Sequence, residues 1–155
     1  MASILAVRQA LAARLETVEG LRVLPYVEGS ISPPAATIVP GIGSETSTSR
    51  PAIDYDKSFR GAVLMNFLVK IAVSSVADDA AQRKLDAYLD VGTDVSVKDA
   101  LEAGMEPIYA EEYDDADDPV VADSVLVKGV SHYGMVEWAG TSYLGADLHV
   151  EVMAR

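Results

Sequence analysis

The stretch from Val63 to Val73 constrains the fold more strongly than any other part of the sequence. Its odd positions are all apolar, whereas the even positions nearby include Asn66, Lys70 and Ser74. This alternation with a period of two is typical of a β-strand that buries one complete face. The pattern therefore predicts a long central strand, whose buried side chains are Val63, Met65, Phe67, Val69, Ile71 and Val73.

The N-terminal segment carries the spacing of an amphipathic helix. Ser3 is a good helix cap, and Gly20 is suited to the left-handed conformation that follows a helix end. Between them, apolar residues recur at steps of three and four, which predicts a helix over Ser3–Glu19. The apolar residues of this helix are Ile4, Val7, Leu11, Leu15 and Val18.

Two later segments begin with the spacing of a capping box, in which a hydroxyl and a carboxylate three residues apart satisfy the first backbone N–H groups of a helix. The pairs are Ser75 with Asp78 and Ser96 with Asp99. The first pair predicts a helix that ends near Asp90, and the second pair predicts a short helix.

The remaining apolar segments read as strands. Leu21–Val27 is a short strand that Pro25 restricts to a sheet edge, and Ala35–Val39 is a second one. From Asp123 onward the alternation predicts a β-meander of three strands that ends at Met153. The expected fold is α+β, with about three helices on a mostly antiparallel or mixed sheet, in a single domain over 1–155.

Two segments show no periodic pattern. Gly41–Gly61 is rich in glycine, hydroxyl and charged residues, which predicts a long loop or arm. A second loop, over 105–121, is acidic and holds six carboxylates in the eight residues of Glu111–Asp118. Loops beyond about 15 residues are commonly binding elements or disordered. The acidic loop fails the calcium-loop pattern, because Pro119 stands where that pattern needs glycine.

Charge and composition exclude several classes of function. The chain of 155 residues has 12 basic and 24 acidic side chains, a net charge of -12, and no cysteine. Such a charge repels nucleic-acid phosphates, and the absence of cysteine excludes disulfides and thiolate metal sites. No apolar stretch of the sequence is long enough to span a membrane, and the N-terminal segment does not have the pattern of an export signal. We therefore expect no membrane partner.

The last predicted strand places three potential ligands on one face: Asp147, His149 and Glu151. Only one of them offers a nitrogen, and His132 is the one other histidine of the chain. Polar residues opposite an apolar row are also what a half-buried strand shows. We therefore expect no metal and no cofactor here. The same triplet is also a candidate lining for a subunit interface.

Catalytic motifs are missing from the sequence. It contains no G-x-S-x-G nucleophile elbow and no G-x-x-x-x-G-K phosphate loop. Carboxylates are numerous, but their number alone does not define an acid–base pair. We expect that the protein is not an enzyme.

Three phrases of the sequence resemble a known family. They are ILAVRQALAARLETVEGLRVLPYVEGSISPPAA, SSVADDAAQRKLDAYLD followed by SVKDALEAG, and VKGVSHYGMVEWAGTSYLGADLHVEVMA. Together they resemble the tail terminator proteins of long-tailed, siphovirus-like bacteriophages, and are most similar to those of actinobacterial phages. The resemblance covers most of the chain outside 41–61 and 105–121.

This resemblance implies a structural virion protein. Six copies form a homohexameric ring on the last ring of the tail tube, end tail polymerisation and offer a docking surface to the head-closure or neck protein. The expected location is the tail–neck junction of the virion, and the host cytoplasm during assembly. Six times -12 gives the ring a charge of -72, so that DNA passes through an acidic lumen only as cargo.

A ring built from head-to-tail contacts needs two complementary patches on each subunit. We assign the interface to the arm, the acidic loop and the polar face of the last strand, because mixed charges and aromatic residues suit wet protein contacts. The candidate interface residues are Arg50, Asp54, Tyr55, Asp56, Lys57, Phe59, Arg60, Glu111, Glu112, Asp114, Asp115, Asp147, His149 and Glu151.

Two alternative functions stay open. One is another head–tail connector, a head-closure or neck protein. Control of tail length distinguishes a terminator from such a connector. The more remote one is a small metal-binding enzyme that uses Asp147, His149 and Glu151. A bound metal that is lost in His149→Ala would support this second alternative.

Overall fold

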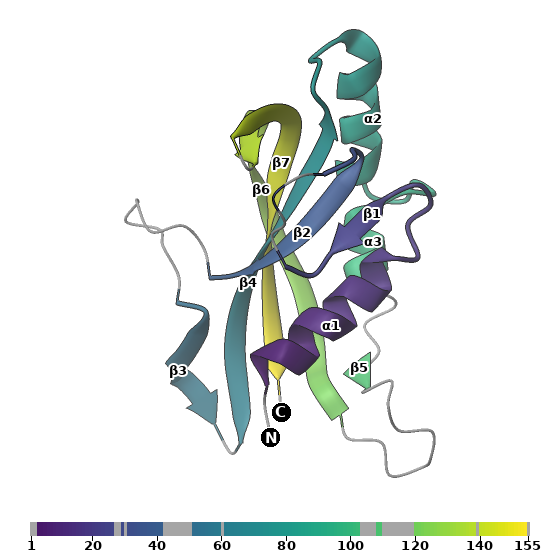
Figure 1. Cartoon of the computed structure of the whole chain (residues 1–155). Coiled ribbons are helices and arrows are strands. Elements are labelled where there is room, and N and C mark those ends of the chain that lie inside the picture. Colours follow the sequence, from purple (N-terminus) through teal and green to yellow (C-terminus); the bar gives the residue numbers. More distant parts are fainter. Residues whose placement is uncertain are drawn as a thin grey trace.

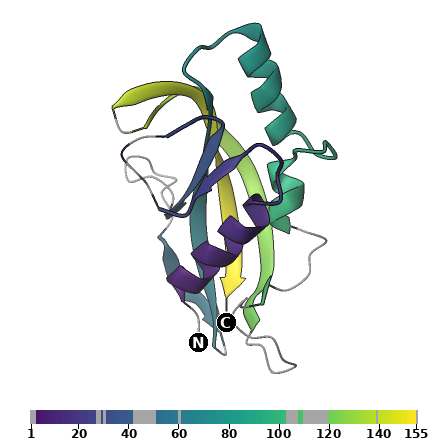
Figure 2. The ribbon, with the colours of Figure 1, turned by 45° about the vertical axis from the view of Figure 1, so that its right-hand side comes forward.

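The chain folds into a mixed β-sheet with three helices on one of its faces (Figures 1 and 2). The computed structural model describes residues 3–26, 29, 31–41, 51–59, 61–102, 108–109, 120–138 and 140–154. The helices are α1 (Ile4–Leu15), α2 (Asp79–Leu89) and α3 (Val97–Glu102). The strands are β1 (Arg22–Leu24), β2 (Ala35–Pro40), β3 (Ile53–Phe59), β4 (Ala62–Ser74), β5 (Ile108–Tyr109), β6 (Val120–Trp138) and β7 (Thr141–Ala154).

The sheet is open and has seven strands, in the order β1-β2-β4-β7-β6-β5, with β3 beside the other end of β4. Among the described strands, the β1–β2 pair is parallel and the other pairs are antiparallel. The predicted α+β class and the mixed, mostly antiparallel sheet are therefore confirmed. No helix in the described ranges is long and apolar enough to cross a membrane.

The predicted central strand is confirmed as β4. It pairs with β7 along its whole length on one side, and with β2 and β3 in succession on the other. Its odd-numbered side chains from Met65 to Ile71 are at most 1% exposed and face the helices. The opposite face is more buried than the sequence pattern predicts, because Leu64, Leu68 and Ala72 are also shielded from solvent.

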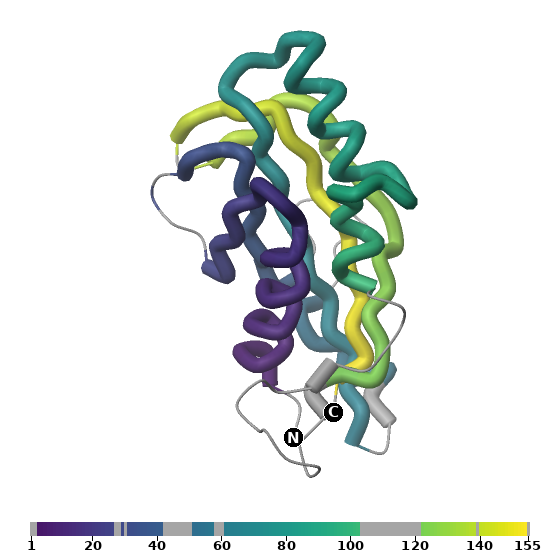
Figure 3. Tube along the Cα trace, turned by 90° about the vertical axis from the view of Figure 1, so that its right-hand side faces the viewer, coloured from purple at the N-terminus to yellow at the C-terminus, as the bar shows by residue number. Residues whose placement is uncertain are grey.

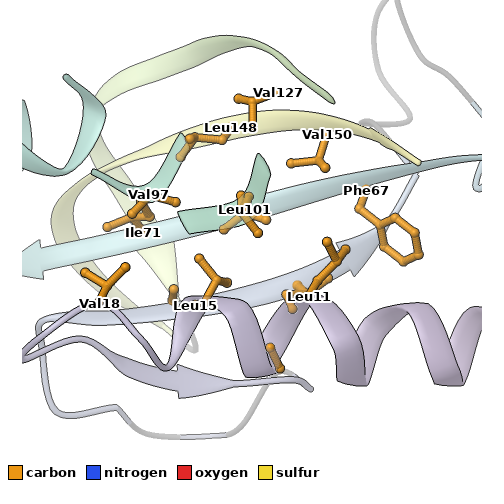
Figure 4. Packing of buried hydrophobic residues seen from close by; sticks show 14 of the residues in the cluster. Leu11, Leu15, Val18, Phe67, Ile71, Val97, Leu101, Val127, Leu148 and Val150 are labelled. Atoms are coloured by element: carbon orange, nitrogen blue, oxygen red, sulfur yellow. The ribbon is translucent and has the colours of Figure 1, made fainter. Parts of the chain in front are cut away.

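The hydrophobic core lies between this face of the sheet and the helices (Figures 3 and 4). In Figure 4, side chains of α1 and α3 meet those of β4, β6 and β7. The burial of these aliphatic side chains, at roughly 25 cal/mol per Å² of apolar surface, is the main force that holds the helices to the sheet. The labelled core residues are Leu11, Leu15, Val18, Phe67, Ile71, Val97, Leu101, Val127, Leu148 and Val150.

The helix caps follow the sequence in two cases of three. The Oγ of Ser3 accepts a bond from the backbone N–H of Ala6, and the Oγ of Ser96 accepts one from Asp99. The cap of α2 is Asp78, whose carboxylate accepts from the N–H of Ala81 at 2.8 Å. The prediction that Ser75 begins this helix is therefore wrong, because the carboxylate itself takes the capping position.

Two predicted ranges need correction. Helix α1 ends at Leu15, before the predicted Glu19, because turns replace the helix ahead of Gly20 at a φ of 78°. The predicted irregular arm over 41–61 contains strand β3. Ile53, Tyr55 and Phe59 occupy alternate positions of β3, but Lys57 interrupts them. Sequence reasoning missed this short, interrupted alternation inside a charged and hydroxyl-rich segment, and the backbone pairing to β4 identifies the strand.

The C-terminal β-meander consists of two long strands where the sequence predicts three. Strand β6 is continuous, but its register against β7 shifts between Ser131 and Gly134. Two residues, His132 and Tyr133, lie there opposite the single residue Ala146, which is a β-bulge. The bulge interrupts the alternation of side chains, and this interruption looks like a strand boundary in the sequence.

The β6–β7 hairpin bends next to the bulge at His132 and Tyr133. Strand β4 also shifts its register, between Ala72 and Ser74, so irregularities on both neighbours flank Gly145 of β7. Figure 2 shows the tip of the hairpin turning away from the helices. The turn brings Trp138 and Tyr143 onto Ala72, where they form a second, small apolar cluster on the outer face of the sheet.

Gly145 permits the bend because no side chain fits at its position. A Cβ placed there would lie 1.9 Å from the backbone oxygen of Ile71 and 2.9 Å from a methyl group of Val136. We expect Gly145→Ala to destabilise the protein by about 3 kcal/mol in urea unfolding, because a backbone oxygen cannot move aside as a side chain can.

The matched control is Gly129→Ala on β6, where a Cβ meets no atom within 4 Å. This change is expected to alter the free energy of unfolding by less than about 1 kcal/mol. An equal loss of unfolding free energy in the two variants would contradict the close approach of Gly145 to the backbone of Ile71.

Candidate functional site

The outer face of the sheet, opposite the helices, carries the predicted polar triplet of β7. Across from Asp147, His149 and Glu151, strand β4 places Lys70, Leu68 and Asn66. Asp147 is only 5% exposed, whereas His149 and Glu151 are half-buried. The prediction that the triplet shares one face is confirmed, and the alternate residues of β7 lie in the core as expected.

Asp147 and His149 belong to a hydrogen-bonded cluster with two residues of β6. The Nδ1 of His132 lies 3.0 Å from Oδ2 of Asp147 and 3.2 Å from the Oγ of Ser131. The same Oγ lies 2.5 Å from Nε2 of His149. Sequence reasoning did not place Ser131 or His132 in a site. The interrupted alternation of side chains near these residues is the one sequence feature that marks the bulge.

The bulge is what brings His132 to Asp147. His132 has a φ of 55°, a left-handed conformation that residues other than glycine adopt uncommonly. A backbone in this region persists only where its surroundings hold it. The contact with Asp147 supplies one such restraint, since it ties the side chain of the bulged residue to the neighbouring strand.

Three buried polar atoms on this face have no hydrogen-bond partner among the described residues. They are Thr37 Oγ1, Asn66 Oδ1 and Asp147 Oδ1, on the adjacent strands β2, β4 and β7. A buried acceptor without a donor costs about 1–3 kcal/mol.

The cluster is not arranged as a Ser-His-Asp relay. Such a relay joins the hydroxyl and the carboxylate through the two different nitrogens of one imidazole. Here Asp147 and Ser131 both contact Nδ1 of His132, and the close Ser131–His149 contact leads to the other histidine. Within the described ranges, no three histidine or acidic side chains are grouped so that they could hold a metal ion.

The predicted arm residues that the structure describes lie on β3. Asn66 fixes the start of this segment, because its Nδ2 donates to the backbone oxygen of Pro51 and its N–H donates to Ala52. Tyr55 is 76% exposed, and Asp56 and Lys57 are also exposed.

Asp54 pairs with Leu64 near the start of β4, whereas Asp147 pairs with Lys70 further along the same strand. Glu151 lies opposite Asn66, and is therefore nearer to the β3 residues than Asp147 is. The side chain of Phe59 and the residues Arg50, Arg60, Glu111, Glu112, Asp114 and Asp115 lie outside the described part of the chain.

The outer edge of β6 is a surface that sequence reasoning missed. Among the described residues, its strand partners are Ile108 and Tyr109 alone, and Glu102 accepts a bond from the N–H of Val127 at 3.0 Å. Large apolar side chains beside this edge are exposed, up to 53% for Met135. A strand pattern does not tell which edge stays open, so the sequence held no signal for it. The exposed apolar residues are Leu126, Val130, Tyr133 and Met135.

Tyr133, the second bulged residue, links the hairpin to helix α2. Its phenol oxygen donates to Oδ1 of Asp86 at 2.7 Å. This hydrogen bond, together with desolvation and the nearby carboxylate charge, raises the pKa of Tyr133 above its ordinary value. Burial also raises the pKa of Tyr88.

The sequence matches no known protein family and no curated protein.

The Tyr133–Asp86 contact predicts a specific alkaline titration. Because the folded-state pKa is raised, the contact persists below the ordinary tyrosine value of about 10 and is lost as the pH rises through the folded value. Asp86→Asn should move the ionisation of Tyr133 to lower pH in an ultraviolet titration of the phenolates. Tyr133→Phe should remove the component that moves. A titration curve that Asp86→Asn leaves unchanged would contradict the contact.

Proposed function

We propose that the protein is the tail terminator of a long-tailed bacteriophage, a structural subunit that closes into a homohexameric ring on the end of the tail tube. The resemblance of three sequence phrases to this family supports the proposal. The ring stops tube growth and offers its other side to the head-closure or neck protein. The protein therefore belongs at the tail–neck junction of the virion, and its function is assembly and not catalysis.

The observation that carries the proposal is the difference between the surface at β6 and the surface at β3, which lie on opposite sides of the central strands β4 and β7. At one edge of the sheet, no described strand other than β5 pairs with the outer side of β6, and large apolar side chains of β6 are exposed. On the other side, β3 offers exposed residues of both charge signs and an aromatic ring, Tyr55. Head-to-tail rings require two unlike surfaces on one subunit, whereas a two-fold dimer uses one surface twice.

The exposed charges on the two surfaces are mixed. Each surface exposes both signs, with Lys128 and Glu137 on β6 and Asp56 and Lys57 on β3. We assign the subunit contact to the β6 edge of one copy and the β3 side of the next. A lumen rich in carboxylates fits the same assembly, because a net charge of -12 per copy keeps passing DNA from binding.

Substitutions on β6 test this contact. We expect the double variant Val130→Lys, Met135→Lys to lose ring formation, because it places two charges in an interface that buries apolar side chains. The measurement is the particle mass in sedimentation, for the protein alone and bound to tail tubes, with electron-microscopic class averages of the ring.

The matched control is Val91→Lys, which changes a valine that is 69% exposed and lies outside β6. It should assemble as the unaltered protein does, and both variants should keep the unaltered thermal unfolding temperature. Rings of normal mass from the β6 double variant would contradict the assignment of this edge as the contact.

A further inference from the structure

Asn66 lies between Leu64 and Leu68 on the outer face of β4, and all three side chains are buried. Asparagine is depleted in strands, and the Oδ1 of Asn66 has no hydrogen-bond partner among the described residues. A buried acceptor of this kind lowers stability, whereas a leucine at the same position would not. A residue that departs from the local pattern at a cost in stability points to a role other than packing.

Three hydrogen bonds of Asn66 lead to the chain just after β2 and just before β3. Its backbone oxygen accepts from the N–H of Gly41 at 2.7 Å, and its own N–H donates to the oxygen of Ala52 at 2.9 Å. Its Nδ2 donates to the oxygen of Pro51, also at 2.9 Å. Strands β2 and β3 follow one another along the same side of β4, so Asn66 marks the point where one ends and the other begins (Figure 1).

Strand β3 has few other ties to the sheet. Among the described residues, Ile53 and Asp54 pair with β4 at one end and Phe59 pairs with it at the other, and the register shifts between these points. The exposed residues 55–57 lie in this shifted part, and no described strand pairs with the outer edge of β3. The place of these exposed side chains therefore depends on how the start of β3 is held.

We propose that Asn66 is the positioning residue of the subunit contact. Its side-chain bond to Pro51 sets the start of β3 on the sheet, and thereby presents Tyr55 and its charged neighbours to the β6 edge of the next copy. This inference rests on the ring proposed above and names the residue that prepares one of its two surfaces. Asn66 is 2% exposed, so it acts through the backbone of Pro51 and Ala52 and not by touching the next copy.

The bond from Nδ2 is the tie that depends on the identity of residue 66. Any residue there offers the backbone N–H that bonds Ala52, whereas the bond to the oxygen of Pro51 needs a side-chain donor. Pro51 has no N–H of its own, so its oxygen is the one backbone group through which it can pair. Burial strengthens this bond, because a hydrogen bond in a low-dielectric interior is stronger than one in water.

The first test variant is Asn66→Leu, which removes the Nδ2 donor and the unpartnered Oδ1 together and fits between Leu64 and Leu68. We expect the concentration at half-maximal ring formation on tail tubes, followed by sedimentation, to rise about tenfold, the effect of one lost hydrogen bond. The temperature of thermal unfolding should stay equal or rise. Hydrogen exchange of the β3 amides should become faster, because the start of the strand opens more often.

The second test variant is Asn66→Asp, which keeps the shape of the side chain. At about pH 8 its carboxylate is ionised and only accepts, so the bond to Pro51 is absent, whereas a neutral carboxyl donates through its O–H. Burial raises the pKa of a carboxyl at this position, and so does the carboxylate of Glu151, which lies opposite on β7. Ring formation relative to the unaltered protein should therefore be impaired at about pH 8 and recover toward about pH 5. Asn66→Leu should not recover.

The matched control is Thr37→Val, which changes another buried polar side chain of the outer face, 1% exposed and with an unpartnered Oγ1. It should assemble as the unaltered protein does at both pH values. Asn66→Leu rings at the unaltered concentration, with unchanged exchange of β3, would overturn the positioning role and leave the ring proposal standing. A loss of assembly that is matched by a loss of unfolding temperature would overturn it as well. Failure of the unaltered protein to form rings would contradict the ring proposal itself.

Discussion

The antiparallel pairing of β4 with β7 is the interaction on which the rest of the structure depends. It joins two strands that are distant in sequence. One face of this strand pair lines the hydrophobic core, and the opposite face carries the polar residues of the outer surface. Helices α1 and α3 pack on the inner face through aliphatic side chains. The outer face gains its polar residues from the same register, because a shift by one residue would exchange the two faces.

The site follows from two irregularities in this regular sheet. Bulges on β4 and β6 flank Gly145, and the hairpin bends where that glycine lets three strands approach one another. The bend moves His132 toward Asp147 and Trp138 onto Ala72. A single geometric feature therefore accounts for both the small apolar cluster and the histidine cluster.

Sequence periodicity identified the elements with strong local signals, which are β4, α1 and the cap at Ser96. It did not find β3, where Lys57 interrupts a short apolar alternation, or the continuity of β6 through the bulge at His132. It placed Asp147 and His149 on one face, because strand alternation is local. The contacts of Ser131 and His132 with them depend on a register shift between strands, which no local pattern encodes.

The most direct test of the account is electron microscopy of tails assembled with this gene intact and with the gene deleted, scored for tube length and attachment to heads. The account predicts over-long, headless tubes in the deletion, and normal tails when the protein is supplied from a plasmid. Headless tails of normal length would contradict a terminator and favour a neck or head-closure protein. Unaltered virions would contradict a role in the tail altogether.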